Sequence, residues 1–205
     1  QNDEIAGKPA VDYFKGKISD PIVAARVRRC CEVPTEAILF NIDSKGGQWK
    51  EGDTSRTALL RAFERVFFEH LGFFGEDLKL ARLEQHIDSK GKTQEFRAAY
   101  ERIGGGNWLE DRESYSYFED DIVEALQEVL GMSEQAARHW FDGTEDDAIA
   151  ADTFAKMVKQ YADKRAEECG GEFRLLFMAD EVGQFIGSDA DMSTSLMLSL
   201  QTLVE

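Results

Sequence analysis

Two short apolar runs, far apart in the sequence, set the strongest limit on the fold of this chain. The first covers residues 37–43 and lies between Pro34 and the pair Gly46-Gly47. The second covers residues 173–179 and follows Gly170-Gly171. Both are rich in strand-forming residues and are too short for an ordinary helix. Such runs are typical of strands that a parallel sheet buries on both faces. We therefore predict two buried strands of an α/β core.

The long stretch between these runs carries a helical pattern instead. From Thr54 to Tyr161 apolar residues recur every three or four positions, and strand signals are missing. The pattern predicts helices at 57–71, 76–89, 93–103, 118–130, 133–141 and 152–164. We therefore expect an all-α insertion at 51–165, between a first part of the core at 1–50 and a return to the core at 166–205.

The first part of the core is predicted to contain a helix as well. Asp20-Pro21 is a favourable helix start, because Asp accepts hydrogen bonds from free amides and Pro tolerates the first turn. This helix should run to about Cys31. Residues 10–14 fit either the end of a helix or a short strand.

Composition excludes several classes of function. The net charge of −16 leaves no broad basic footprint for nucleic acid, and an anionic membrane surface would repel the chain. The many acidic residues are expected to form a solvated surface. No apolar run reaches the length of a bilayer span, and no secretion signal is seen. The three cysteines lack metal-ligand spacing and are expected to be reduced thiols in a cytoplasmic protein.

The second apolar run ends in Asp180-Glu181, and this ending suggests chemistry. In P-loop nucleoside triphosphatases a buried strand ends in an Asp that helps to hold Mg²⁺, usually through water. In many ATPases a Glu follows and orients or deprotonates the attacking water. Asp180 is thus the candidate for Mg²⁺ and nucleotide binding, and Glu181 is the candidate catalytic residue. The alternative is an ordinary buried strand with an acidic exit loop.

The phosphate loop of such an enzyme, GxxxxGK[ST], does not occur in the sequence. Gly91-Lys92-Thr93 imitates its end, but His86 stands where the first Gly belongs and no strand precedes it. We interpret this segment as a linker between two helices. Gly7-Lys8-Pro9 also fails, because Pro9 replaces the hydroxyl residue that would bind Mg²⁺. The loop is expected upstream of Gln1, so that this chain alone should be inactive.

Other candidate sites are weaker. Residues 188–194 form either a sensor or interaction loop near the nucleotide or a solvated turn. The three histidines are scattered among predicted helices, which argues against a zinc site. The aromatic residues of the helical stretch are interpreted as its core rather than as a stacking platform for nucleic acid.

Three segments carry a resemblance to a known family. Residues 176–187 read LFMADEVGQFIG, and residues 10–21 and 38–45 read AVDYFKGKISDP and ILFNIDSK. In this order they resemble the large P-loop ATPase of bacterial BREX phage-resistance systems, the BrxC/PglY family. The likeness spans nearly the whole chain and is loosest in the helical middle.

The resemblance implies a much longer cytoplasmic ATPase that uses ATP and Mg²⁺. It also implies other BREX components as partners in blocking phage DNA replication. Carried over by position, Asp180 would serve Mg²⁺ and Glu181 the hydrolytic water. Asp43 would either support these residues or cap a turn. A second hypothesis belongs to another class: a non-catalytic module in which the acidic helical insertion binds a partner protein.

Overall fold

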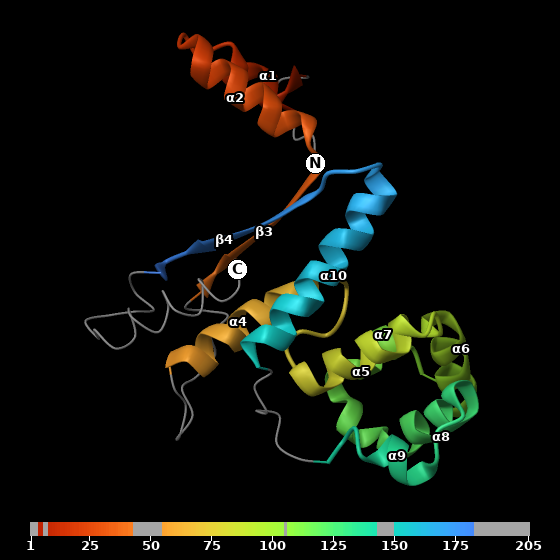
Figure 1. Ribbon diagram of the computed structural model, residues 1–205. Helices are drawn as coiled ribbons and strands as arrows, with labels where there is room; N and C mark the ends of the chain where they lie inside the picture. Colours follow the sequence, from red (N-terminus) through yellow and green to blue (C-terminus); the bar gives the residue numbers. More distant parts are fainter. Residues whose placement is uncertain (1–3, 6–7, 43–54, 105, 143–149, 183–205) are drawn as a thin grey trace. The chain divides into compact units, whose positions relative to one another are not determined.

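The computed structural model describes residues 4–5, 8–42, 55–104, 106–142 and 150–182. The chain is a mixed α/β protein, mostly helical, with a small two-stranded parallel sheet (Figure 1). It divides into two compact units. One comprises Gln1–Leu39 and Ala155–Met178, and the other comprises Phe40–Phe154 and Ala179–Glu205. The three-part division expected from the sequence stays a prediction.

The parallel sheet consists of β3 (Thr35–Asn41) and β4 (Arg174–Asp180). These are the two strands predicted from the apolar runs, and Figure 1 shows them side by side. At the start of the pair, the backbone N–H of Arg174 donates to the carbonyl of Pro34 at 3.0 Å. Because the strands are parallel, both of their carboxyl ends lie at the same edge of the sheet.

The predicted burial of both strand faces is wrong. Along β3 buried and exposed side chains alternate: Ile38 and Phe40 are each 6% exposed, whereas Leu39 is 73% exposed. Along β4, Leu176 is 46% and Met178 is 51% exposed. Strands buried on both faces need helices on both sides of the sheet, and alternation is the pattern of a sheet covered on one side. In the described part of the chain, the sheet follows the second pattern.

The first unit begins with a short hairpin and two helices. β1 (Glu4–Ile5) pairs antiparallel with β2 (Lys8–Pro9), and α1 (Ala10–Lys15) and α2 (Pro21–Glu32) follow. The helical alternative for residues 10–14 is therefore confirmed. Asp20 caps α2 as predicted, accepting from the N–H groups of Ile22 at 2.7 Å and Val23 at 3.0 Å. No residue of α2 is buried.

A polar cluster in the same unit joins the sheet to α10 (Ala151–Cys169). Glu36 of β3 accepts a hydrogen bond from the Tyr161 hydroxyl at 2.6 Å. Arg165 approaches the other carboxylate oxygen with Nε at 3.0 Å and a terminal nitrogen at 2.8 Å. Burial, followed by the hydrogen bond to Glu36, raises the pKa of Tyr161 to about 12. The cluster thus provides hydrogen-bond partners for both carboxylate oxygens of Glu36, a residue that is only 8% exposed.

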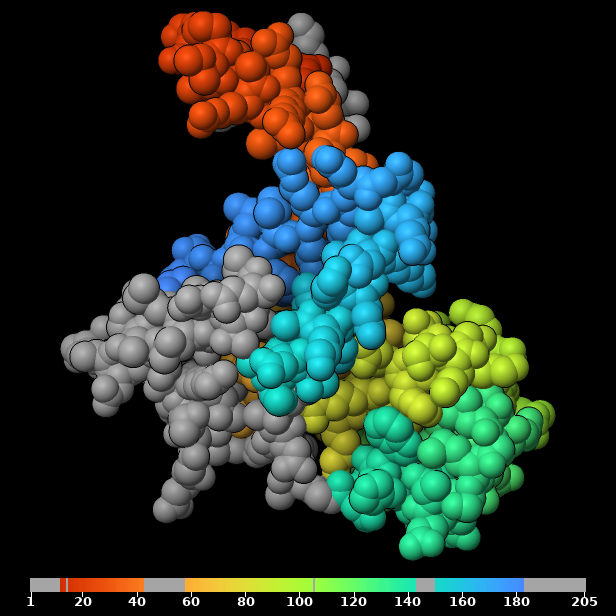
Figure 2. Space-filling view, in the orientation of Figure 1, coloured from red at the N-terminus to blue at the C-terminus, as the bar shows by residue number. Residues whose placement is uncertain are grey.

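The second unit contains the helical body. Its elements are α4 (Ser55–His70), α5 (Leu78–Ser89), α6 (Thr93–Gly104), α7 (Trp108–Asp111), the 3-10 helix η1 (Arg112–Tyr117), α8 (Glu119–Leu130) and α9 (Glu134–Arg138). The predicted helices are confirmed with shifted ends, and α7 and η1 are additions to them. Figure 2 shows the segments from α6 to α9 as one continuous green mass.

Aromatic and aliphatic side chains of α5 to α9 form the core of this body. Phe96, Tyr100 and Trp108 meet edge-on or stacked, with ring centroids 5.1–6.4 Å apart. Such ring pairs add to the free energy gained from burial. Of the aromatic residues predicted to form the core, Phe63, Phe67 and Phe68 are buried, and Phe74, Trp140 and Phe141 pack partly buried against this cluster. Among the described residues, no helix is both long and apolar enough to cross a membrane.

Two buried carboxylates are neutralised inside the body. Glu64 of α4 is fully buried and receives two hydrogen bonds from Arg82 of α5, at 2.8 and 3.0 Å. Burial nevertheless raises the pKa of Glu64, and Arg82 acts in the opposite direction. Glu84 accepts from the indole N–H of Trp108 at 2.8 Å and from the backbone N–H of Phe74 at 2.6 Å. Each carboxylate therefore fixes the packing of two segments.

Candidate functional site

The carboxyl edge of the parallel sheet brings three polar residues together. Asp180 is the last residue of β4, and Glu181 follows it directly. Asn41 is the last residue of β3, and its side-chain N–H donates to the Glu181 carboxylate. The backbone N–H of Glu181 donates to Oδ1 of Asp180 at 2.8 Å. Asp180 and Glu181 thus lie next to each other at a strand end, where ligands of open α/β sheets collect.

Glu181 has an unusual backbone conformation. Its φ is +58°, and no other non-glycine residue in the described part of the chain has a positive φ. For a residue with a Cβ, this left-handed conformation costs about 1–2 kcal/mol. The bonds to Asp180 and Asn41 hold Glu181 in it. Strained residues of this kind concentrate at functional sites, where the surrounding structure fixes their geometry.

The two carboxylates differ in their exposure to water. Asp180 is exposed and Glu181 is half-buried. An exposed carboxylate at a strand end suits Mg²⁺ bound through water, because Mg²⁺ keeps much of its hydration shell. Within the described residues, no three His, Cys, Asp or Glu side chains converge in a way that could hold a metal ion on their own. This arrangement fits a metal held by one carboxylate together with substrate phosphates, and it does not fit an all-protein metal cage.

Asn41 was missed by the sequence analysis, which had selected Asp43 at the end of this strand. Asp43 lies outside the described residues, as do residues 188–194 and the part of the LFMADEVGQFIG segment that follows Val182. A signal for Asn41 was present, since it is the polar residue between the apolar Phe40 and Ile42. Its contact with a residue 140 positions away follows only from the strand pairing.

Gly91-Lys92-Thr93 is a helix connection, as predicted. Gly91 has a φ of +66° between α5 and α6, which accounts for a glycine there. The Lys92 ammonium pairs with Glu95 at 3.0 Å, and the Thr93 hydroxyl donates to Asp88 at 2.9 Å. Both side chains that would contact phosphate in a P-loop are therefore engaged in local contacts.

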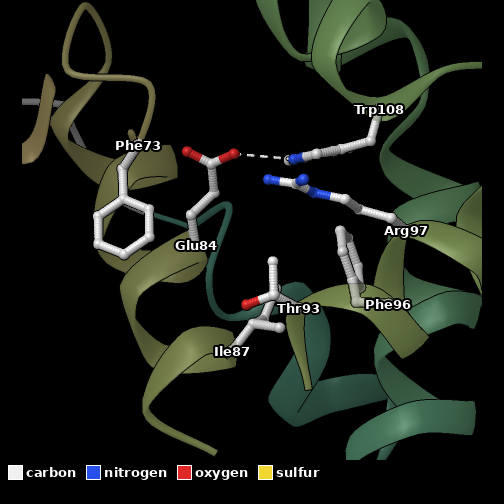
Figure 3. A pocket seen from close by; sticks show the side chains of 7 residues that line it. All are labelled: Phe73, Glu84, Ile87, Thr93, Phe96, Arg97 and Trp108. Atoms are coloured by element: carbon white, nitrogen blue, oxygen red, sulfur yellow. Dashed lines mark hydrogen bonds between the residues drawn. The ribbon is translucent and has the colours of Figure 1, made fainter. Parts of the chain in front are cut away.

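A small pocket lies among α5, α6 and α7 (Figure 3). Its lining residues are Phe73, Glu84, Ile87, Thr93, Phe96, Arg97 and Trp108. The space inside it is about 10 Å³, close to the minimum for one water molecule. Small-molecule sites are typically larger by more than an order of magnitude, about 300 Å³ or above. This pocket is therefore a packing gap and no nucleotide site.

Comparison with known proteins gives no family for the chain. No protein-family model matches it, and no solved structure matches it.

Proposed function

We propose that this chain is part of a P-loop nucleoside triphosphatase similar to the BREX phage-resistance ATPases. The observation that carries the proposal is the sheet edge, where Asp180 and Glu181 adjoin at the end of a parallel strand and Asn41 contacts Glu181. The resemblance of residues 10–21, 38–45 and 176–187 supplies the family. On the strength of this resemblance we also propose a cytoplasmic location, ATP as the substrate and other BREX components as partners.

In this proposal each residue of the edge has its own role. Mg²⁺, when bound with ATP, would supply positive charge that stabilises the negative charge developing on the phosphates. The exposed Asp180 carboxylate would hold this ion through water. Glu181 accepts a proton from the attacking water, and Asn41 sets the orientation of the Glu181 carboxylate. Asn41 is thus a positioning residue.

The chain contains the residues proposed to bind Mg²⁺ and to activate water, Asp180 and Glu181, but its sequence contains no phosphate-loop motif. Most contacts to phosphate in such enzymes come from that loop. We therefore expect the 205-residue chain by itself to bind ATP weakly and to hydrolyse none. Hydrolysis is expected in the longer protein that contains the loop.

The Mg²⁺ dependence of ATP turnover in that longer protein tests the role of Asp180. Asp180→Asn removes the negative charge but keeps the shape, so half-maximal turnover should need at least about tenfold more Mg²⁺. Glu172→Asn, at an exposed acid just before β4, is the control and should leave this dependence unchanged. Equal Mg²⁺ dependence in Asp180→Asn and the unmodified protein would remove Asp180 from metal binding.

A second candidate function is protein binding by the helical body. The observation that favours it is the pair of exposed acids Glu110 and Glu113 between two exposed apolar residues in the sequence, with Leu109 44% and Tyr117 86% exposed. Clusters of large apolar residues are rare on the surface of a monomeric protein, and where they occur they commonly mark a site of interaction. This candidate and the ATPase proposal are compatible within one protein.

A further inference from the structure

The α2 helix is a basic and exposed element in a strongly acidic chain. α2 carries three basic side chains (Arg26, Arg28, Arg29) and one acid, Glu32 at its last position, and Asp20 directly precedes it, whereas the whole chain has a net charge of −16. Asp20 is occupied in capping the helix. Among the described residues, no carboxylate forms an ion pair with any of the three arginines. The positive charge of α2 is therefore available to a partner.

The same helix also exposes apolar surface. Ile22 is 66% exposed and Val23 is 46% exposed. On a helix, residues four and seven positions apart share a face, so Ile22 lies in line with Arg26 and Arg29. We call these three residues, together with Val23, the basic face. Arginine beside exposed aliphatic side chains is the composition of a protein interface more than of a phosphate-binding surface, where apolar side chains contribute little.

The complementary composition occurs on α7, η1 and the first turn of α8. Between residues 109 and 121 there are six acids (Glu110, Asp111, Glu113, Glu119, Asp120, Asp121) and one basic residue, Arg112. Arg112 is already engaged with Glu84 at 3.2 Å. Glu110 and Glu113 are exposed, three positions apart, and have no ion-pair partner among the described residues. Leu109 and Tyr117, which flank these two acids in the sequence, are exposed apolar residues. We call Leu109, Glu110, Glu113 and Tyr117 the acidic face.

We infer that the basic face of one molecule docks on the acidic face of a second copy. The charges of the two faces are opposite: two arginines without an ion-pair partner would lie against two glutamates without one. Both faces also expose apolar side chains, so Ile22 and Val23 could pack against Leu109 and Tyr117. The contact therefore joins two unlike surfaces of neighbouring copies. This inference does not depend on the proposed ATPase activity.

Sedimentation velocity of the chain over a range of protein concentrations tests the docking. We expect association that increases with concentration and weakens with salt, because the Debye length falls from about 10 Å at 0.1 M to about 3 Å at 1 M. R26E/R29E should weaken the association constant by at least about tenfold, since like charges would then face each other. K156E/K164E is the control: it changes the net charge equally at two exposed lysines of α10 and should leave association intact.

A charge-swap experiment makes the test specific. E110K/E113K should associate as weakly as R26E/R29E, because both faces of E110K/E113K are then basic. A mixture of R26E/R29E with E110K/E113K should associate again, since every contact between the two variants then joins an acidic face to a basic one. Circular dichroism should show both variants folded, as all four positions are exposed. The inference would be overturned if the chain stayed monomeric at every concentration, or if the mixture of the two variants did not associate. It would also be overturned if R26E/R29E associated normally and lost only the ability to bind labelled duplex DNA, because the arginines would then serve nucleic acid.

Discussion

The ion pair between Glu64 and Arg82 allows a quantitative prediction for Arg82→Ala. Glu64 is fully buried and receives two hydrogen bonds from Arg82, at 2.8 and 3.0 Å. Removing the arginine leaves a buried carboxylate without its counter-charge, which typically costs about 3–5 kcal/mol of unfolding free energy. For a chain of this size, that lowers the melting temperature by on the order of 10 °C.

An exposed pair at the same distance provides the control. Lys159 and Asp163 are also 2.8 Å apart, but their side chains are 74% and 61% exposed. Surface pairs contribute about 0–1 kcal/mol, so Lys159→Ala should change stability little. Urea denaturation of both variants at neutral pH measures the difference. The reasoning is refuted if Arg82→Ala destabilises the protein no more than Lys159→Ala does.

The pH dependence of Arg82→Ala follows from the pKa of Glu64. Burial raises the pKa of Glu64 in the folded state above its ordinary value of 4.5. The stability that the protonated carboxyl group contributes is therefore present below about pH 4.5 and is lost as pH rises through the folded-state pKa. Arg82 lowers the folded pKa, and its removal should raise it further. The deficit of Arg82→Ala relative to the unmodified protein should therefore shrink as pH falls. The double variant Glu64→Met/Arg82→Met should be close to the unmodified protein, because apolar side chains can replace a buried pair.

Three further predictions concern other contacts. Trp108→Phe removes the 2.8 Å bond to buried Glu84 and should cost about 1–3 kcal/mol in urea denaturation. Tyr161 has a pKa raised to about 12, so its contribution to stability is intact below about pH 10, the pKa of a free tyrosine, and is lost as pH rises through about 12. Tyr161→Phe should remove one late step from the tyrosinate absorbance titration. Asp20→Ala should cost about 1 kcal/mol or less and reduce the helical signal in circular dichroism, whereas Asp20→Asn should retain both.

Helix starts were the most predictable part of the fold, because they depend on local hydrogen bonds. Asp20 and Ser133 cap α2 and α9, as the sequence indicated. The start expected at Glu76 falls instead after Asp77, whose side chain accepts from the N–H of Leu80 at 2.9 Å. The end of α9 depends on tertiary packing and not on local hydrogen bonds. The helix was expected to extend to Phe141, but it ends at Arg138, and Phe141 packs against the core of the body.

The candidate site was predictable only in part, for a similar reason. An apolar run ending in Asp180-Glu181 marks a strand end in the sequence itself. The residue that contacts Glu181 depends on which strand pairs with β4 and in which register. A single amino-acid sequence does not reveal either. The uniform apolar run of β4 also indicated burial on both faces, whereas Leu176 and Met178 are half exposed. What covers a strand face is a property of distant segments.

ATP turnover by the longer protein, with and without Glu181→Gln, tests the central claim most directly. The substitution removes the proton acceptor but retains the hydrogen-bonding shape, so turnover should fall by about 10²–10⁴-fold while nucleotide binding persists. Glu172→Gln, at an exposed acid outside the site, should turn over ATP at the normal rate. Full turnover by Glu181→Gln would contradict the assignment of Glu181 to the hydrolytic water.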